Sequence, residues 1–361
     1  MSYRYIGSKA RLTGPLADAI EPFRRSSDRF VDAFAGTGAV AAIAADAGWR
    51  VWINDTLPSA ATMSAARLIA SDEAPFEKLG GYASAIAMLN AADPIQGYFY
   101  ETYSPASAKH DAAGIARMYL TQANASRLDA VREQIEVWAR DGVIHSEEET
   151  LLLADTIAAV NRCANIAGTY GCFLSKWQAS ALRPLALVPR DLRATRVDWC
   201  LSTSDARELR VQVDDLVYID PPYTKRQYAS YYHILESIVL NDGPDVQGVS
   251  GLRPWHTKAS PFCYKRKALG ALVDLVERLD SKQAIISYSS EGHVDLKELL
   301  AALRVSGEVE CEAIGGVGRY RPNQTASSHG EAVTEYIIVY RRSFRSTRAV
   351  SASSTVHETA A

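Results

Sequence analysis

Residues 28–47 constrain the fold of this chain more than any other segment. Residues 28–34 (DRFVDAF) are an apolar run typical of a short buried strand, residues 35–38 (AGTG) form a glycine turn, and residues 39–47 are an alanine-rich helical run. A strand, a glycine turn and a helix in this order are typical of the first unit of a parallel α/β sheet. A second strand at residues 49–53 and a helix at residues 59–70 continue the pattern.

Strand signals return in the second half of the chain, at residues 215–220, 283–288, 308–314 and 334–340. Helical runs at residues 231–240, 268–279 and 294–303 separate the earlier of these strands. No helix separates the last two, so we expect them to form an antiparallel pair at one edge. The expected fold class is α/β, with a Rossmann-like, mostly parallel sheet and an antiparallel edge strand.

The middle and the end of the chain follow other patterns. Between about residues 75 and 188 the periodicity is that of long helices, as at residues 126–140 and 147–160, without a strand rhythm. We therefore expect an inserted helical lobe at residues 75–196, between core segments at residues 1–74 and 197–342. Residues 343–361 are rich in Ser, Thr and Ala, which predicts a disordered tail.

Composition restricts the partners and the compartment. The longest stretch without a charged residue has 14 residues, too few to span a bilayer, and the first residues lack a signal-peptide pattern, so we expect a cytoplasmic protein without a membrane partner. Five cysteines without C-x-x-C spacing indicate neither a disulfide framework nor a zinc site, and no metal is expected. His233, His256 and His293 lack ligand spacing and are assigned to packing or the surface.

Nucleic-acid binding would have to be local, because the net charge is -3 and the pI is about 6.2. Residues 246–267 contain no Asp or Glu and interleave basic with aromatic side chains: Arg253, Lys258, Lys265, Arg266 and Lys267 with Trp255, Phe262 and Tyr264. This composition suits a nucleic-acid surface. A solvated loop with a few anchoring aromatic residues explains it equally well.

The glycine turn predicts a nucleotide-like ligand. Gly36 and Gly38 allow the backbone to approach a ligand and direct helix N-terminal N–H groups at it, and Asp55 follows the next strand, where it can accept hydrogen bonds from ribose. Any adenosine-containing cofactor fits this arrangement. Ala41 completes a G-x-G-x-x-A pattern, so a dinucleotide oxidoreductase remains an alternative at this point.

A second motif, Asp220-Pro221-Pro222-Tyr223, directly follows an apolar strand and so lies at the carboxyl edge of the sheet. The two prolines remove two N–H donors, which leaves carbonyl oxygens beside the Asp220 carboxylate. Such an acceptor-only turn suits an amino group on a planar base, and Tyr223 offers a face for stacking. The chemistry that fits is attack by this nitrogen on a methyl group carried by a sulfonium. The alternative is a rigid structural turn.

These motifs together resemble the adenine-specific DNA methyltransferases of the Dam-like class, nearest to the FokI-type modification enzymes. The similarity lies in the residues 5–9 (YIGSK), 32–38 (DAFAGTG), 54–55 (ND) and 220–223 (DPPY), which occur in the order of that family. Further similarity lies at residues 165–171, 226–228, 232–236 and 286–292. The resemblance implies a Rossmann-like methyltransferase sheet that binds S-adenosylmethionine and double-stranded DNA.

The resemblance also implies residue roles. The implied cofactor-binding residues are Tyr5, Lys9, Asp32, Phe34, Gly36, Gly38, Asp55, Asp205 and Asp220, with Asp55 at the ribose and Asp205 near the adenine unless it is only a helix cap. The implied catalytic residues are Asp220, Pro221, Pro222 and Tyr223. The expected reaction is methylation of the N6 atom of an adenine flipped out of duplex DNA, with an independently acting restriction endonuclease as a candidate partner.

Other outcomes stay open from the sequence. The same chemistry would serve cytosine N4, an RNA base or a glutamine amide, and a catalytically silent DNA-binding protein would share the fold. Target recognition is expected in the helical lobe and in residues 226–267, outside the catalytic sheet. The glycine- and arginine-containing loop at residues 315–321 is either a phosphate clamp or a plain hairpin loop.

Overall fold

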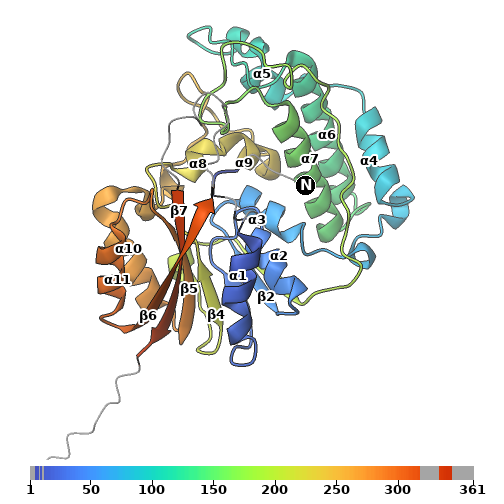
Figure 1. The fold of residues 1–361 in the computed structure, drawn as a ribbon. Coiled ribbons are helices and arrows are strands. Elements are labelled where there is room, and N and C mark those ends of the chain that lie inside the picture. The colour runs from blue at the N-terminus through green and yellow to red at the C-terminus, as the bar shows by residue number, and fades with distance from the viewer. Residues whose placement is uncertain (1–4, 8, 10–11, 318–332, 344–361) are drawn as a thin grey trace, which may run out of the picture.

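The computed structural model describes residues 5–7, 9, 12–317 and 333–343, and these contain one seven-stranded sheet of order β3-β2-β1-β4-β5-β7-β6. Helices cover both faces of the sheet, and a group of further helices lies beyond one end of it (Figure 1). The strands are β1 (Phe30–Asp32), β2 (Val51–Asn54), β3 (Trp199–Ser202), β4 (Leu216–Ile219), β5 (Gln283–Ser289), β6 (Gly307–Val317) and β7 (Val333–Arg342).

Strands β3, β2, β1, β4 and β5 pair in parallel, so their carboxyl ends share one edge of the sheet. Strand β7 runs antiparallel between β5 and β6. This confirms the expected mostly parallel sheet with an antiparallel pair at one edge. The structure adds that β7 pairs with β5 and lies between β5 and β6, so β6 is the edge strand on this side of the sheet.

Apolar side chains on both faces hold the central strands. Phe30, Leu216 and Tyr218 lie in a core under α1 (Thr13–Ile20) and α2 (Ala39–Asp46). Val31 and Val217 point to the opposite face, into a core with α10 (Lys265–Arg278) and α11 (Leu296–Leu303). Because both faces are covered, the central strands appear in the sequence as continuous apolar runs.

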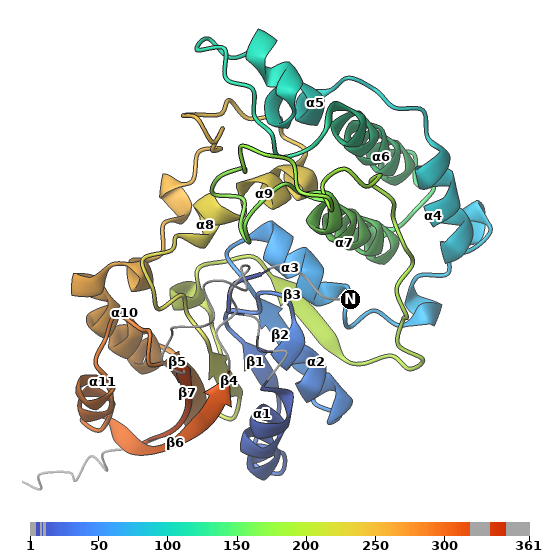
Figure 2. The same cartoon turned by 45° about the horizontal axis from the view of Figure 1, so that its top comes forward.

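The expected helical insertion is present as α4 (Tyr82–Ala91), α5 (Tyr98–Tyr103), α6 (Gln122–Arg140) and α7 (Ser146–Cys163). The turned view shows α6 and α7 side by side, with α3 (Pro58–Ala65), α8 (Tyr228–Tyr231) and α9 (His233–Leu240) between them and the sheet (Figure 2). Helices α6, α7 and α9 contribute side chains to one continuous core. The exact borders of the lobe given above stay a prediction.

A buried ion pair within the lobe also connects it to the core segment before it. Arg190, on the segment that returns from the lobe, donates from Nε and Nη2 to Oδ1 of Asp155 on α7, at 2.8 and 2.7 Å. The other carboxylate oxygen accepts the Tyr82 hydroxyl, and Nη1 of Arg190 donates to the Ala66 carbonyl directly after α3. The network joins the two parts of the chain through groups that are almost fully withdrawn from water.

Two elements were not expected from the sequence. Helix α1 precedes the glycine turn, and β3 is the edge strand beside β2. The side chains of β3 are half-buried or exposed, so its sequence lacks the apolar run that marks β4. The predicted tail from residue 344 and most of the loop at residues 315–321 lie outside the described residues.

We expect Asp155→Ala to lower the free energy of unfolding by about 3–5 kcal/mol, because it leaves the buried Arg190 guanidinium without its counter-charge. The measurement is chemical denaturation followed by circular dichroism. The matched control is Asp274→Ala, which removes an exposed partner of Arg278 and should cost less than about 0.5 kcal/mol. Equal losses in the two variants would contradict this role for Asp155.

Candidate active site

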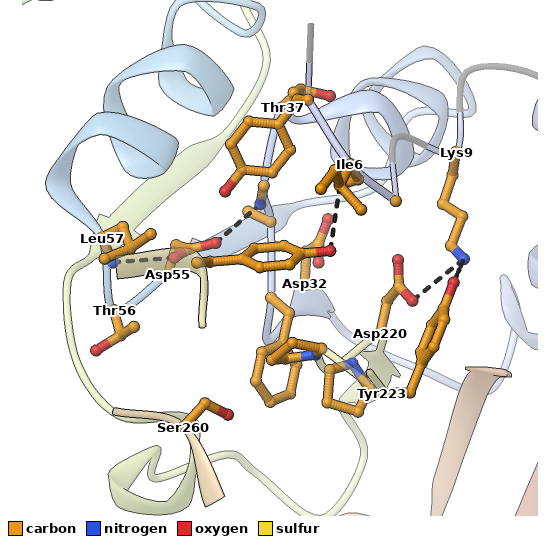
Figure 3. Close-up of a pocket in the computed structure, with 18 of the residues that line it drawn as sticks. Ile6, Lys9, Asp32, Thr37, Asp55, Thr56, Leu57, Asp220, Tyr223 and Ser260 are labelled. Atoms are coloured by element: carbon orange, nitrogen blue, oxygen red, sulfur yellow. Dashed lines mark hydrogen bonds and ion pairs between the residues drawn. The ribbon is translucent and has the colours of Figure 1, made fainter. Parts of the chain in front are cut away.

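A cleft with about 830 Å³ of free space, the solvent at its open mouth included, lies at the carboxyl ends of β1, β2 and β4 (Figure 3). Open α/β sheets bind ligands at this edge. The lining comes from distant parts of the chain: residues 5–7 and 9, residues 35–37 of the glycine turn, residues 55–57, Tyr218 with residues 220–223, residues 227–229, and Lys258 with Ser260. The cleft thus brings together the two motifs that the sequence singled out.

The glycine turn is closed by Asp55. The Gly36 N–H donates to Oδ2 of Asp55 at 3.0 Å, and the Leu57 N–H donates to Oδ1 at 2.9 Å. Gly36 has φ of +53°, a conformation that favours glycine. Burial raises the pKa of Asp55 to about 6, although the two backbone hydrogen bonds oppose the shift. The carboxylate fixes the turn and also lines the cleft, where it can accept ribose hydroxyls.

Gly38 has a different position from Gly36. Gly38 is not one of the described residues that line the cleft. It directly precedes α2 and has φ of +75°. A Cβ atom there would lie 2.6 Å from the Cα of Ser64. The structure therefore shows Gly38 allowing α2 to pack closely on α3, and its direct contact with a cofactor stays a prediction.

Asp32 and Phe34 also line the cleft. Asp32 is 1% exposed, and its Oδ1 has no hydrogen-bond partner among the residues that the structure describes. Burial, together with the nearby Asp220, raises the pKa of Asp32 well above its ordinary value. Phe34 lines the cleft and packs edge-on against Phe262, with ring centroids 5.5 Å apart. Asp32 lines the cleft, and a buried carboxyl oxygen without a partner suits a cationic group of a ligand nearby.

The second motif begins where β4 ends. Oδ1 of Asp220 lies 3.2 Å from the Lys9 ammonium, and the side chains are 13% and 5% exposed. Burial raises the pKa of Asp220 to about 6, even though Lys9 lowers it. The Lys9 ammonium also donates to the Tyr223 hydroxyl at 3.4 Å (Figure 3). Pro221 and Pro222 line the same wall, so acceptors and apolar rings dominate this side of the cleft.

Tyr5 lines the cleft from above the glycine turn. Its ring stacks on Tyr232 at a centroid distance of 4.1 Å and meets Tyr228 edge-on at 5.7 Å. The Tyr232 hydroxyl accepts the Ile6 N–H at 2.6 Å. These contacts hold Tyr5 and Ile6 against Tyr228 and Tyr232 at the cleft. The cofactor role of Tyr5 and Lys9 stays a prediction.

Asp205, like Gly38, is a predicted site residue outside the cleft lining. Its carboxylate accepts the Arg207 N–H at 3.0 Å and pairs with the Arg207 guanidinium at 2.5 Å. It caps a single helical turn, one of the two roles that the sequence allowed. A contact with a cofactor adenine stays a prediction.

Several residues at the cleft had no role assigned from the sequence. Lys258 lines the cleft and forms an ion pair with Glu236 at 3.0 Å. Glu236 also accepts the Ser59 N–H at the start of α3. Gln227 pairs with both backbone groups of Ser260 at 2.8 and 3.1 Å. The absence of acidic residues around Lys258 was visible in the sequence, but its partner Glu236 lies 22 positions away.

The basic residues of the segment 246–267 fall into a paired group and an exposed group. Arg253 pairs with Asp242 and Lys258 with Glu236, whereas Lys265, Arg266 and Lys267 are exposed at the start of α10. Tyr264, directly before them, is 45% exposed. One exposed basic cluster therefore remains as a surface for an anionic partner.

Two of the histidines contact backbone carbonyl groups. His233 is fully buried beside the Tyr170 carbonyl at 2.9 Å, and burial lowers its pKa to about 3. His293 approaches the Cys263 carbonyl at 3.2 Å. Within the described ranges, no three His, Cys, Asp or Glu side chains are grouped to hold a metal ion. The helices in those ranges include none with the length and apolar character needed to cross a membrane.

Comparison with known proteins gives matches along most of the chain. Residues 5–301 match the model of the D12 class N6 adenine-specific DNA methyltransferase family. The chain is 30% identical to the modification methylase LlaI of Lactococcus lactis subsp. lactis, over 96% of this chain and 56% of that protein. It is 32% identical to the type II methyltransferase M.FokI of Planomicrobium okeanokoites, over 96% and 54%.

A shorter relative matches from end to end. The type II methyltransferase M.NlaIII of Neisseria lactamica is 29% identical, over 94% of this chain and 99% of that protein. The chain thus spans about half the length of the LlaI and FokI methylases and nearly all of the NlaIII enzyme.

We expect Gly38→Ala to destabilise the protein by more than about 1 kcal/mol, because it combines a left-handed backbone with a Cβ clash against Ser64. The matched control is Gly14→Ala in α1, where a Cβ would meet no atom within 4 Å. That change should stabilise by roughly 0.5–1 kcal/mol. Thermal melts of the two variants should move in opposite directions, and a neutral Gly38→Ala would contradict the packing role.

Proposed function

The chain belongs to the D12 class of N6 adenine-specific DNA methyltransferases, and we propose that it transfers a methyl group from S-adenosylmethionine to the N6 atom of an adenine in double-stranded DNA. The observation that carries the proposal is the meeting of two motifs in one cleft: the glycine turn closed by Asp55, and the Asp220-Pro221-Pro222-Tyr223 turn. The glycine turn can hold a nucleoside, and the Asp220 turn can hold an amino group.

The residues of the cleft fit S-adenosylmethionine. Asp55 offers acceptors to a ribose, and Phe34 and Leu57 offer apolar surface. Asp32 lines the same cleft and has one buried oxygen without a partner, whose negative charge a cationic ligand would compensate. Carboxylates outnumber ammonium groups in the lining, which favours a ligand that carries positive charge. When bound, the cofactor supplies a methyl group on a positively charged sulfur.

Asp220 and the Pro221 carbonyl would bind the amino group of the target base. The Lys9 ammonium engages Oδ1 of Asp220, so Oδ2 is the oxygen left for an N–H of the base. Two accepted N–H bonds favour a pyramidal nitrogen whose lone pair points outward. Asp220, Pro221, Pro222 and Tyr223 are accordingly the proposed catalytic residues.

Tyr223 would provide the stacking surface. Its ring lines the cleft and meets Tyr288 edge-on, with centroids 5.6 Å apart, which fixes its plane. A base inside a duplex cannot reach this wall, so the adenine has to leave the stack before it reacts. The energy of stacking on Tyr223, about 1–3 kcal/mol, would offset part of the cost of flipping.

DNA would lie across the open side of the cleft. The exposed Lys265, Arg266 and Lys267 suit phosphate contacts, and the lobe with α4 to α7 is the proposed target-recognition part. The names of the relatives, modification methylase and type II methyltransferase, support a role in a restriction–modification system. In such a system the partner is an endonuclease that acts separately, and the compartment is the cytoplasm.

We expect Asp220→Asn to reduce methyl transfer at least about 100-fold while the affinity for S-adenosylmethionine changes only a few-fold, because the amide is a weaker acceptor of the same shape. Incorporation of tritiated methyl groups into duplex DNA measures the first and calorimetry the second. Asp214→Asn, six residues earlier at an exposed pair with Lys282, is the matched control. A fully active Asp220→Asn enzyme would refute the assignment.

We expect Asp55→Ala to weaken S-adenosylmethionine binding roughly tenfold or more, because the change removes the ribose acceptor and also the group that closes the glycine turn. Calorimetry measures the affinity, and Asp72→Ala at an exposed pair with Arg196 serves as control. Unchanged cofactor affinity in a folded Asp55→Ala protein would place the ribose elsewhere.

A further inference from the structure

Glu335 reaches the active site from the reversed strand β7. Because β7 runs against β5, its first residues lie where the parallel strands end, and Glu335 is opposite Ser289, the last residue of β5. From there Oε2 of Glu335 lies 3.2 Å from the Lys9 ammonium. No family motif named above contains Glu335, and it lies beyond residues 5–301 that match the family model.

Lys9 therefore bridges two carboxylates. Its nitrogen is 3.2 Å from Oδ1 of Asp220 and 3.2 Å from Oε2 of Glu335, and its side chain is only 5% exposed. The other ionisable groups that act on Asp220 or Lys9 are Asp32 on β1, Tyr218 on β4, Tyr223 after β4 and Tyr228 on α8. One ammonium thus serves two nearly buried carboxylates.

Sharing the ammonium changes what Asp220 can do. A lysine paired with Asp220 alone would draw the carboxylate charge to itself and make Asp220 a poorer acceptor for an amino group. A second anion on the same nitrogen pulls the ammonium partly away and adds its own negative field at Asp220. Both effects make the free oxygen of Asp220 a stronger acceptor.

We propose that Glu335 is a positioning residue for methyl transfer: it holds Lys9 between two carboxylates and so keeps Asp220 in place as a strong acceptor for the target amine. The inference rests on the proposed function, since it concerns the same reaction. Glu335 itself contacts Lys9 rather than the reacting atoms.

The charges in the structure support this assignment. Burial raises the pKa of Asp220 most, Lys9 lowers it, and Glu335 raises it. Burial alone would lower the pKa of Lys9, but its anionic neighbours, Asp220 first and Glu335 among them, hold that pKa well above its ordinary value. Lys9 therefore stays charged throughout the range in which Asp220 titrates, and removing either neighbour has a defined sign.

The test is the pH dependence of single-turnover methylation. Glu335→Gln keeps an acceptor for Lys9 but removes the charge, so the acidic limb of the profile should move down by about one pH unit and the plateau rate should fall roughly tenfold. Lys9→Gln should move the acidic limb in the opposite direction, up in pH. A purely structural role for Glu335 would lower the rate without this pair of opposite shifts.

A readout without turnover accompanies the kinetics. Carbon-13 carboxyl titration of the cofactor-free protein, with the Asp220 signal assigned through Asp220→Asn, should show the Asp220 midpoint lower in Glu335→Gln than in wild type. The matched control is Glu310→Gln on β6, which removes an exposed carboxylate that pairs with Arg341. This change should leave the Asp220 midpoint and the acidic limb of the rate profile unchanged.

The outcomes separate the two proposals. A folded wild-type protein that does not methylate DNA would contradict the proposed function, whereas an active wild type with an unmoved Asp220 midpoint in Glu335→Gln would overturn the role of Glu335. Should Glu335→Gln fail to fold, Glu335→Asp, one methylene shorter, should shift the midpoint in the same direction by a smaller amount. An unshifted midpoint in that folded variant would equally overturn the inference.

Discussion

The burial of carboxylates at one edge of a parallel sheet is the constraint on which the rest of this structure depends. Asp32, Asp55 and Asp220 follow or end three neighbouring strands, and each is largely withdrawn from water. Such groups are tolerated only where hydrogen bonds, cations or a ligand compensate them. Backbone N–H groups do this for Asp55, and Lys9 does it for Asp220. Backbone hydrogen bonds at Phe34 and Ala41 compensate Asp32 only in part, since its Oδ1 has no partner among the described residues.

Acidic and basic side chains lie on different surfaces of the protein. The cleft gathers negative charge and suits a cationic cofactor, but it would repel a DNA backbone. The exposed basic cluster at the start of α10 lies outside the cleft lining, where phosphates can be bound without approaching the buried acids. The overall net charge of -3 conceals this division, because it averages two surfaces with opposite preferences.

The parts of the site that are local in sequence could be predicted, and the parts that depend on chain reversal could not. The glycine turn and the Asp220 turn each follow an apolar strand, so their place at the sheet edge followed from the pattern alone. Glu335 reaches the same edge because β7 enters in reverse, which no local pattern reveals. Likewise, Gly36 and Gly38 look equivalent in sequence, and only packing against Ser64 distinguishes them.

The stack of Tyr5 on Tyr232 ties ligand occupancy to the architecture of the lobe. Both rings belong to the core that includes side chains of α6 and α7. A ligand that contacts Tyr5 in the folded protein would therefore stabilise this core and the helices packed in it. The lobe would then be stiffest when the methyl donor is loaded. Under the proposed function, in which the lobe reads the DNA target, the methyl donor would thus order the reading surface before DNA binds.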